Sequence, residues 1–295
     1  MIQKITAKQH RAMVMNTHKT GLALKGLFVL GIMIFFNPVS ASSSEDAWSF
    51  SLGAGVYAES VYFGSDETVA APVPCAKAMY SNGNVSASLS LLEGIGIMYT
   101  DKSSHFYGAI NLNNGDERDA EEYTLLGRKT DHSDRVKKLL EGSPSVKTGV
   151  CTEIMIGYLS DIGNFALSLE YHPTTVEAEK EQSYNGFIAS FSCFKPFHIS
   201  EKLTITGMLD LNVMDKNYAE AWFSVKNPTH RLESFDAAAG LRDIQVIVQI
   251  DYMIWPNIGI TFLNGNSFLL MDAGDSPYTE SKHQMSSVLY GFYNF

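Results

Sequence analysis

The stretch LTITGMLDLNV, residues 203–213, places an apolar or small residue at every second position. Thr204, Thr206, Met208, Asp210 and Asn212 fall between them. Because successive side chains of a β-strand point to opposite faces, this pattern predicts a strand with one apolar and one polar face. The same alternation recurs at residues 85–91, 165–172 and 244–254. The repetition indicates an all-β fold.

Three features favour a transmembrane barrel over a soluble sandwich. The alternating runs span roughly 9 to 15 residues, longer than the strands of most soluble sheets. Tyr and Phe concentrate near the expected strand ends, as an aromatic girdle requires: Tyr57, Tyr62, Phe63, Tyr80, Tyr99, Tyr158 and Tyr171. The last strand places Leu289, Gly291, Tyr293 and Phe295 on one face. It resembles the C-terminal signal by which the barrel assembly machinery recognises outer-membrane proteins.

The lengths of the links predict an antiparallel up-and-down barrel of about 12 strands. Short links are expected at 81–84, 101–104, 161–164, 200–202 and 255–257. Long links are expected at 61–68, 114–144, 174–182, 215–235 and 272–283. Outer-membrane barrels alternate short periplasmic turns with long external loops. The expected links follow this order except at one place, where the short link 81–84 is followed directly by the short link 101–104. A tight external turn at Glu93 and Gly94 restores it, with strands at 85–92 and 96–101; a barrel of 10 strands is the alternative.

The N-terminus predicts export. Residues 1–41 consist of a basic segment, the apolar stretch GLFVLGIMIFF and a small-x-small cleavage site that ends at Ala41. This is the order of segments in a secretory signal peptide. The basic segment is long, so Met13 and Met15 are alternative starts. Residues 42–295 are then the barrel domain, placed in the outer membrane of a Gram-negative cell. The net charge of −10 argues against a nucleic-acid partner.

The charged link 114–144 is interpreted as a solvated surface loop. Within it, residues 133–141 predict a short helix with Ser133 as N-cap and Gly142 just past the end. The segments 64–66 and 273–277 are interpreted as turns, because Gly and Asp allow the backbone angles that turns need.

The interior of the barrel is expected to be partly filled. Met208, Ile247, Met253 and Phe292 have the parity of the polar face and would point inward. Arg242 has the lipid-facing parity of Ile244, so it is expected either near the outer rim or turned inward by a bulge at Gly240, where it would pair with Asp243.

Residues that could carry chemistry are sparse. Cys75, Cys151 and Cys193 are far apart with no CxxC pair, which argues against a metal site or a disulfide framework. No GxSxG or HExxH motif is present. Ser168, Glu170 and His172 share the polar face of one strand and could form a base and its orienting partner, although a lumenal hydrogen-bond network is the plainer interpretation. The sequence therefore predicts no enzyme, no catalytic residues, no metal and no cofactor.

Five stretches, in order along the chain, resemble the MipA/OmpV family of outer-membrane proteins. They are YFGSD at 62–66, APVP at 71–74, AWFSV at 221–225, AGLRD at 239–243 and DSP at 275–277. The resemblance implies an outer-membrane barrel. The family's named member is described as a scaffold that links a murein-degrading transglycosylase to a bifunctional penicillin-binding protein, and other members as adhesins, osmoregulated proteins or antigens.

The expected function follows from that resemblance. It is a non-enzymatic scaffold or interaction protein for murein-synthesising and murein-degrading machinery, held in the lipid bilayer. Its partners would be a periplasmic murein hydrolase and a penicillin-binding protein. A small-solute channel and a surface adhesin or antigen are the alternatives.

Overall fold

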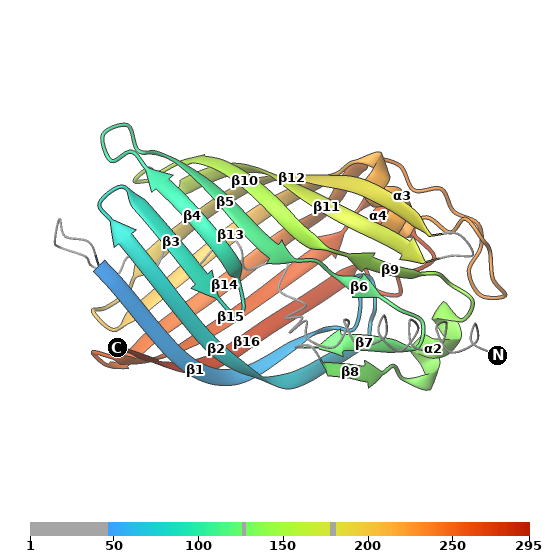
Figure 1. Ribbon diagram of the computed structural model, residues 1–295, viewed down its shortest axis with the longest axis horizontal. Coiled ribbons are helices and arrows are strands. Elements are labelled where there is room, and N and C mark those ends of the chain that lie inside the picture. The colour runs from blue at the N-terminus through green and yellow to red at the C-terminus, as the bar shows by residue number, and fades with distance from the viewer. Residues whose placement is uncertain (1–46, 126–127, 178–180) are drawn as a thin grey trace, which may run out of the picture.

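The computed structural model describes residues 47–125, 128–177 and 181–295, so the signal peptide expected at 1–41 lies outside the described part. Twelve antiparallel strands form a closed barrel, in which β16 pairs with β1 (Figure 1). The wall strands are β1 (Ala47–Ser60), β2 (Thr68–Asn82), β3 (Val85–Ser90), β4 (Gly94–Thr100), β5 (Phe106–Asn114), β10 (Val150–Tyr158), β11 (Asn164–Glu177), β12 (Gln182–His198), β13 (Leu203–Met214), β14 (Gly240–Trp255), β15 (Ile258–Leu269) and β16 (His283–Asn294). The predicted up-and-down barrel of 12 strands is confirmed, and the alternative of 10 strands is wrong.

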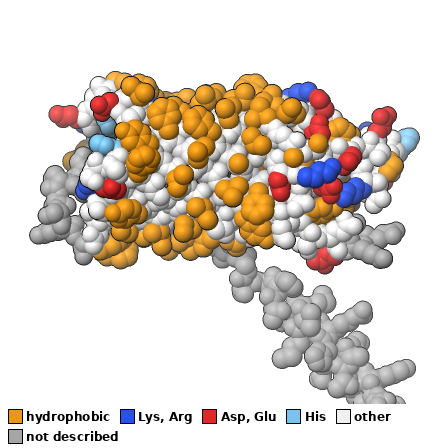
Figure 2. Space-filling model, turned by 90° about the horizontal axis from the view of Figure 1, so that it is seen from above, with side chains coloured by type: hydrophobic (Ala, Val, Ile, Leu, Met, Phe, Trp, Pro, Cys, Tyr) orange, Lys and Arg blue, Asp and Glu red, His pale blue; other side chains and the backbone are white. Residues whose placement is uncertain are grey.

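Apolar side chains cover the outside of the barrel and polar ones line its interior. On β13, Leu209 and Val213 are each 45% exposed, whereas Asp210 and Asn212 are buried. Figure 2 shows the apolar side chains gathered around the middle of the molecule and the charged ones near its two ends. This distribution of apolar and polar side chains is the reverse of that in a soluble protein, and it fits a wall that is surrounded by lipid.

Aromatic residues mark the end of the barrel that carries the short turns. Trp48, Phe106 and Trp255 are exposed there, as an interfacial girdle requires. The prediction was wrong for Tyr57 and Tyr62, which are buried, and for Phe63, which packs inside the barrel against Phe223. Tyr57 lies on the lumenal face of β1, and Tyr62 belongs to a loop that folds inward.

The links alternate in length as predicted, with two differences in extent. The tight external turn is at 91–93, so β3 ends two residues earlier and β4 begins two residues earlier than expected. β11 continues to Glu177, which reduces the predicted long link 174–182 to four residues. No helix in the described part of the chain is long and apolar enough to span a membrane.

The link 114–144 is an organised structure rather than a plain solvated loop. It contains β6 (Glu117–Arg118), a hairpin of β7 (Glu122–Leu125) and β8 (Arg128–Asp131), and helix α2 (Asp134–Leu140); β9 (Ser145–Thr148) follows and pairs with β6 and β11. The helix prediction is confirmed, because Ser133 caps α2 and Gly142 has φ +78°. The solvated interpretation is wrong for Arg118, which is buried.

The turn between β4 and β5 makes stability depend on pH. Side-chain hydrogen bonds from Ser104 and Ser103 lower the pKa of Asp101 to about 2. An unfolded aspartate titrates near pH 4, so the stabilisation is complete above that value and is lost as pH falls toward 2. We expect Asp101→Asn to unfold at lower urea than the wild type at pH 7, with the difference shrinking between pH 4 and pH 2. A difference that stays constant over this range would contradict the assignment.

Candidate functional site

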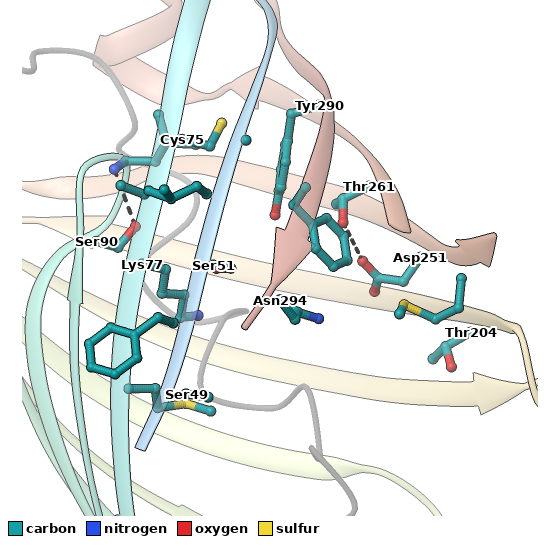
Figure 3. Close-up of a pocket in the computed structure, with 18 of the residues that line it drawn as sticks. Ser49, Ser51, Cys75, Lys77, Ser90, Thr204, Asp251, Thr261, Tyr290 and Asn294 are labelled. Atoms are coloured by element: carbon teal, nitrogen blue, oxygen red, sulfur yellow. Dashed lines mark hydrogen bonds between the residues drawn. The ribbon is translucent and has the colours of Figure 1, made fainter. Parts of the chain in front are cut away.

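A cavity of about 750 Å³ lies in the lumen at the end of the barrel that carries the short turns. In outer-membrane barrels this end faces the periplasm. Figure 3 shows its lining, with Ser49, Ser51, Cys75 and Lys77 from β1 and β2, and Asp251, Thr261 and Tyr290 from β14, β15 and β16. The lining reaches the exposed turn 200–202, so the cavity extends to the periplasmic mouth.

The cavity combines charged and apolar groups. Lys77 Nζ lies 3.3 Å from a carboxylate oxygen of Glu93, and the Thr261 hydroxyl donates to Asp251 at 2.7 Å. Met253 and Phe292 also line it, which confirms their predicted inward direction. A lining of this kind suits an amphipathic molecule or peptide segment rather than a bare ion.

The other end of the lumen is filled by loops. Helix α3 (Lys216–Phe223) packs against the inner side of β12, and its Tyr218, Trp222 and Phe223 are buried in an apolar cluster. A Cβ atom at Gly186 of β12 would lie 2.9 Å from the backbone of Tyr218. Glycine is therefore required for α3 to approach the wall this closely. We call α3, together with the loop residues packed against it, the plug.

A buried ion pair joins the plug to the wall. The pairing of β13 with β14 shifts between Asn212 and Val213, which leaves Arg242 as the extra residue of a bulge. The bulge turns Arg242 inward, where it pairs with Asp243 and donates to the Tyr218 hydroxyl at 3.2 Å. Asn212 donates to the other oxygen of Asp243 at 2.7 Å. The predicted lumenal ion pair is confirmed, although the bulge lies at Arg242 itself rather than at Gly240.

A second buried arginine fastens the plug from the opposite side. The guanidinium of Arg118 donates to the carbonyl of Trp222 and lies 3.6 Å from the centre of the Tyr278 ring. Ser276 donates to the carbonyl of Phe223 at 2.7 Å. These contacts satisfy carbonyls at the end of α3 that the helix itself leaves free.

Four of the five stretches that carry the family resemblance converge on the plug. Phe63 packs on Phe223 and lies under the Arg242 guanidinium. Gly64 has φ +114° and forms the predicted turn. The turn expected at 273–277 is in part helix α4 (Met271–Asp275), from which the chain leads to Ser276. These residues therefore build the closure of the barrel.

In the trio predicted on β11, the contact that the structure shows is between Glu170 and His172. His172 Nε2 lies 3.1 Å from Glu170 Oε2, and its Nδ1 lies 3.4 Å from Cys151 Sγ on β10. Cys151 thus takes the place that the sequence suggested for Ser168, and the residues form a thiol–imidazole–carboxylate series. Cross-strand register explains why the sequence missed it, because 21 residues separate Cys151 from His172.

The order of the three groups in this cluster resembles that of a catalytic triad, but the thiol and the imidazole are buried and not open to a substrate. Cys151 is 0% exposed and His172 1% exposed, and the edge of the Tyr218 ring covers the imidazole at 5.0 Å between centroids. One ligand atom from each of the three residues lies within 4.8 Å of the others. However, the imidazole presents a different nitrogen to the thiol and to the carboxylate, so the observed contacts are not those of one ion's coordination sphere.

Comparison with solved structures finds other barrels at low similarity. OmpT of Vibrio cholerae matches with 8% identity and a TM-score of 0.36, covering 85% of this chain and 97% of that one. The outer-membrane channel DcaP of Acinetobacter baumannii matches with 9% identity and a TM-score of 0.36, covering 86% and 99%. The NalP translocator domain of Neisseria meningitidis matches with 10% identity and a TM-score of 0.34, covering 98% and 96%. Scores this low support no conclusion about function.

Sequence comparison identifies the family of the chain, which the comparison of structures does not. No curated protein sequence matches the chain. The model of the family described as MltA-interacting protein MipA matches residues 52–295, which include β1 from Leu52 onward, the other eleven wall strands and the plug. The resemblance carried by the five stretches is thereby confirmed. The chain belongs to the MltA-interacting protein MipA family, and it is an outer-membrane β-barrel.

Proposed function

We propose that this barrel is a non-enzymatic scaffold that binds a murein-degrading transglycosylase at its periplasmic mouth. The observation that carries the proposal is the asymmetry of the lumen. Its loop end is filled by the plug, whereas its turn end holds a cavity of about 750 Å³ that reaches the exposed turn 200–202. The family's name supports the class of partner, since it describes an interaction with MltA.

The cavity is suited to a peptide segment of such a partner. Its lining contains the ion pair of Lys77 with Glu93 and the hydrogen bond of Thr261 to Asp251, together with the apolar side chains of Met253 and Phe292. Glu201 and Lys202 stand at the mouth, where they would meet the partner's surface first. Charges at the rim of an interface steer and orient a partner more than they add affinity.

A binding measurement tests the scaffold. The detergent-solubilised full barrel is immobilised, and a purified MltA-type transglycosylase is passed over it. We expect saturable binding, and the double charge reversal Glu201→Lys with Lys202→Glu should weaken it by about tenfold, or roughly 1.4 kcal/mol. Charge reversal of Arg231 and Glu233, exposed at the opposite end, is the matched control. Absence of binding by the folded wild type would overturn the proposal.

Conductance separates the scaffold from a small-solute channel. Because the plug packs across the loop end, the wild-type barrel should be silent in planar bilayers. Steady single-channel steps from the wild type would favour the channel instead. Loss of binding to host surfaces after deletion of residues 119–143 would favour the adhesin.

A further inference from the structure

The hydrogen-bonded wall is interrupted between β2 and β5. β2 pairs with β1 along its whole length, Thr68 to Ser81, but with β3 only from Lys77 to Asn82. The strands between them are short, with 6 residues in β3 and 7 in β4. No described strand therefore pairs with the β3-facing edge of residues 68–76. We call this interruption the notch; it lies beyond the tip of the β3–β4 hairpin, to the right of the tip in Figure 1.

The notch lies at the depth of the lipid. On one side, Pro72 of β2 is opposite Val56 of β1, which is 53% exposed on the outer face. On the other side, Asn114 of β5 is opposite Val150 of β10, which is 56% exposed. Apolar outward side chains therefore continue past the notch on both flanks. Unpaired strand edges are avoided at this depth unless protein covers them or they border a cavity.

Pro72 and Pro74 reduce the number of unpaired backbone N–H groups along this edge of β2. The carbonyl of Ala76 accepts from the Leu91 amide, so the backbone of even-numbered β2 residues faces the notch. Pro72 and Pro74 share that parity, and neither has an N–H group that would be left unpaired. The same prolines prevent a partner strand from completing the sheet there. The edge is thus suited to contact with lipid chains and not to strand addition.

Behind the notch lies an apolar layer that continues into the cavity. Val73 and Cys75 point inward from β2 and pack with Tyr57, and Leu92 of the hairpin tip packs against them. Cys75, Leu92 and Glu93 are also part of the cavity lining. Cys75 and Leu92 therefore belong to both the apolar layer and the cavity lining. Figure 3 shows Cys75 and Lys77 at this side of the cavity.

We propose that the notch is a lateral access site, through which a single-chain anionic amphiphile of the outer membrane inserts its acyl chain into the lumenal cavity. The occupant of the notch is lipid-like, because the lipid bilayer is in contact with an apolar gap at this depth. Met79, Met253 and Phe292 provide apolar surface for the chain inside the cavity. Lys77, where the pairing of β2 with β3 begins, is the cation of the cavity lining that lies at the notch, and the head group would compete with Glu93 for it.

The three native cysteines provide a matched test. Cys193 has the lipid-facing parity of Phe191, which is 41% exposed, and reports contact with the bilayer. Cys151 lies on β10 opposite Asn113 of β5 and is 0% exposed. Cys75 points inward behind the notch. Variants that keep one cysteine each, with serine at the other two, are placed in lipid nanodiscs with palmitic acid that carries a maleimide on its last carbon. Albumin in the water removes reagent that leaves the bilayer.

We expect Cys193 and Cys75 to be labelled and Cys151 to remain unlabelled. Leu92→Ala in the Cys75 variant removes the side chain of the hairpin tip that packs against this apolar layer, and it should accelerate labelling at Cys75 by about fivefold. A small water-soluble maleimide, applied to the same Leu92→Ala variant, checks that the thiol is reactive. Labelling of Cys75 that is no faster than that of Cys151 in both backgrounds would overturn the proposal, whichever result the water-soluble reagent gives.

Discussion

Arg242→Met is expected to lower the free energy of unfolding of the barrel by about 3–5 kcal/mol, the usual cost of removing one partner from a buried ion pair. Asp243 is 0% exposed and would keep a charge without its counter-ion. The substitution also removes the hydrogen bond to the Tyr218 hydroxyl and the contact with the Phe63 ring. Urea unfolding in detergent micelles, followed by tryptophan fluorescence, measures the loss, since Trp222 is buried in the plug.

Arg135→Met is the matched control. Arg135 lies at the rim of the same end of the barrel, where it pairs with Asp66 and with Glu280 at 2.6 Å. Its side chain is 49% exposed, and exposed ion pairs contribute about 0–1 kcal/mol. The double variant Arg242→Met with Asp243→Asn removes the orphaned charge and should recover part of the loss. Equal losses in the Arg242 and Arg135 variants would contradict the assigned role of the buried pair.

The wall of the barrel could be predicted because its determinants are local. Alternation along residues 203–213 and 244–254 identifies each strand and its lipid-facing side without any tertiary information. The order of short and long links then sets the strand number, and it required a turn near Glu93 that the structure contains. Helix α2 was found for the same reason, because its N-cap and its terminal glycine are adjacent to it in sequence.

The plug could not be predicted because its determinants are long-range. Residues 215–235 were expected only as a long link, but they contain a helix signal: Asp215 is an N-cap whose side chain accepts from the Tyr218 amide, and the segment KNYAEAWF follows it. That signal would have located α3 but not its position inside the barrel. The inward placement depends on Gly186, Arg118 and Arg242, which come from three different strands. Likewise, the charge run around Arg118 resembles a solvated loop, and only the register of β6 with β9 shows that Arg118 turns inward.

Gly186→Val is expected to make the silent barrel conduct. The first added carbon would lie 2.9 Å from backbone atoms of Tyr218, and backbone in a helix cannot yield as the end of a flexible side chain can. α3 must therefore move away from β12, which separates Tyr218 from Arg242 and opens the packing of the plug. Overpacking of this kind costs about 1–3 kcal/mol, less than the roughly 5–15 kcal/mol by which folded proteins are typically stable, so we expect the barrel itself to remain folded.

Single-channel recording in planar bilayers, together with the mobility of unboiled and boiled samples on gels, provides the test. The wild type should be silent, and Gly186→Val should give discrete steps while keeping the faster mobility of a folded barrel. Gly207→Val is the control: Gly207 lies on the neighbouring strand β13, and a Cβ atom there would meet no atom within 4 Å. If Gly207→Val conducts as well, the steps arise from a general loosening of the wall. If Gly186→Val folds and stays silent, α3 is not what closes the lumen.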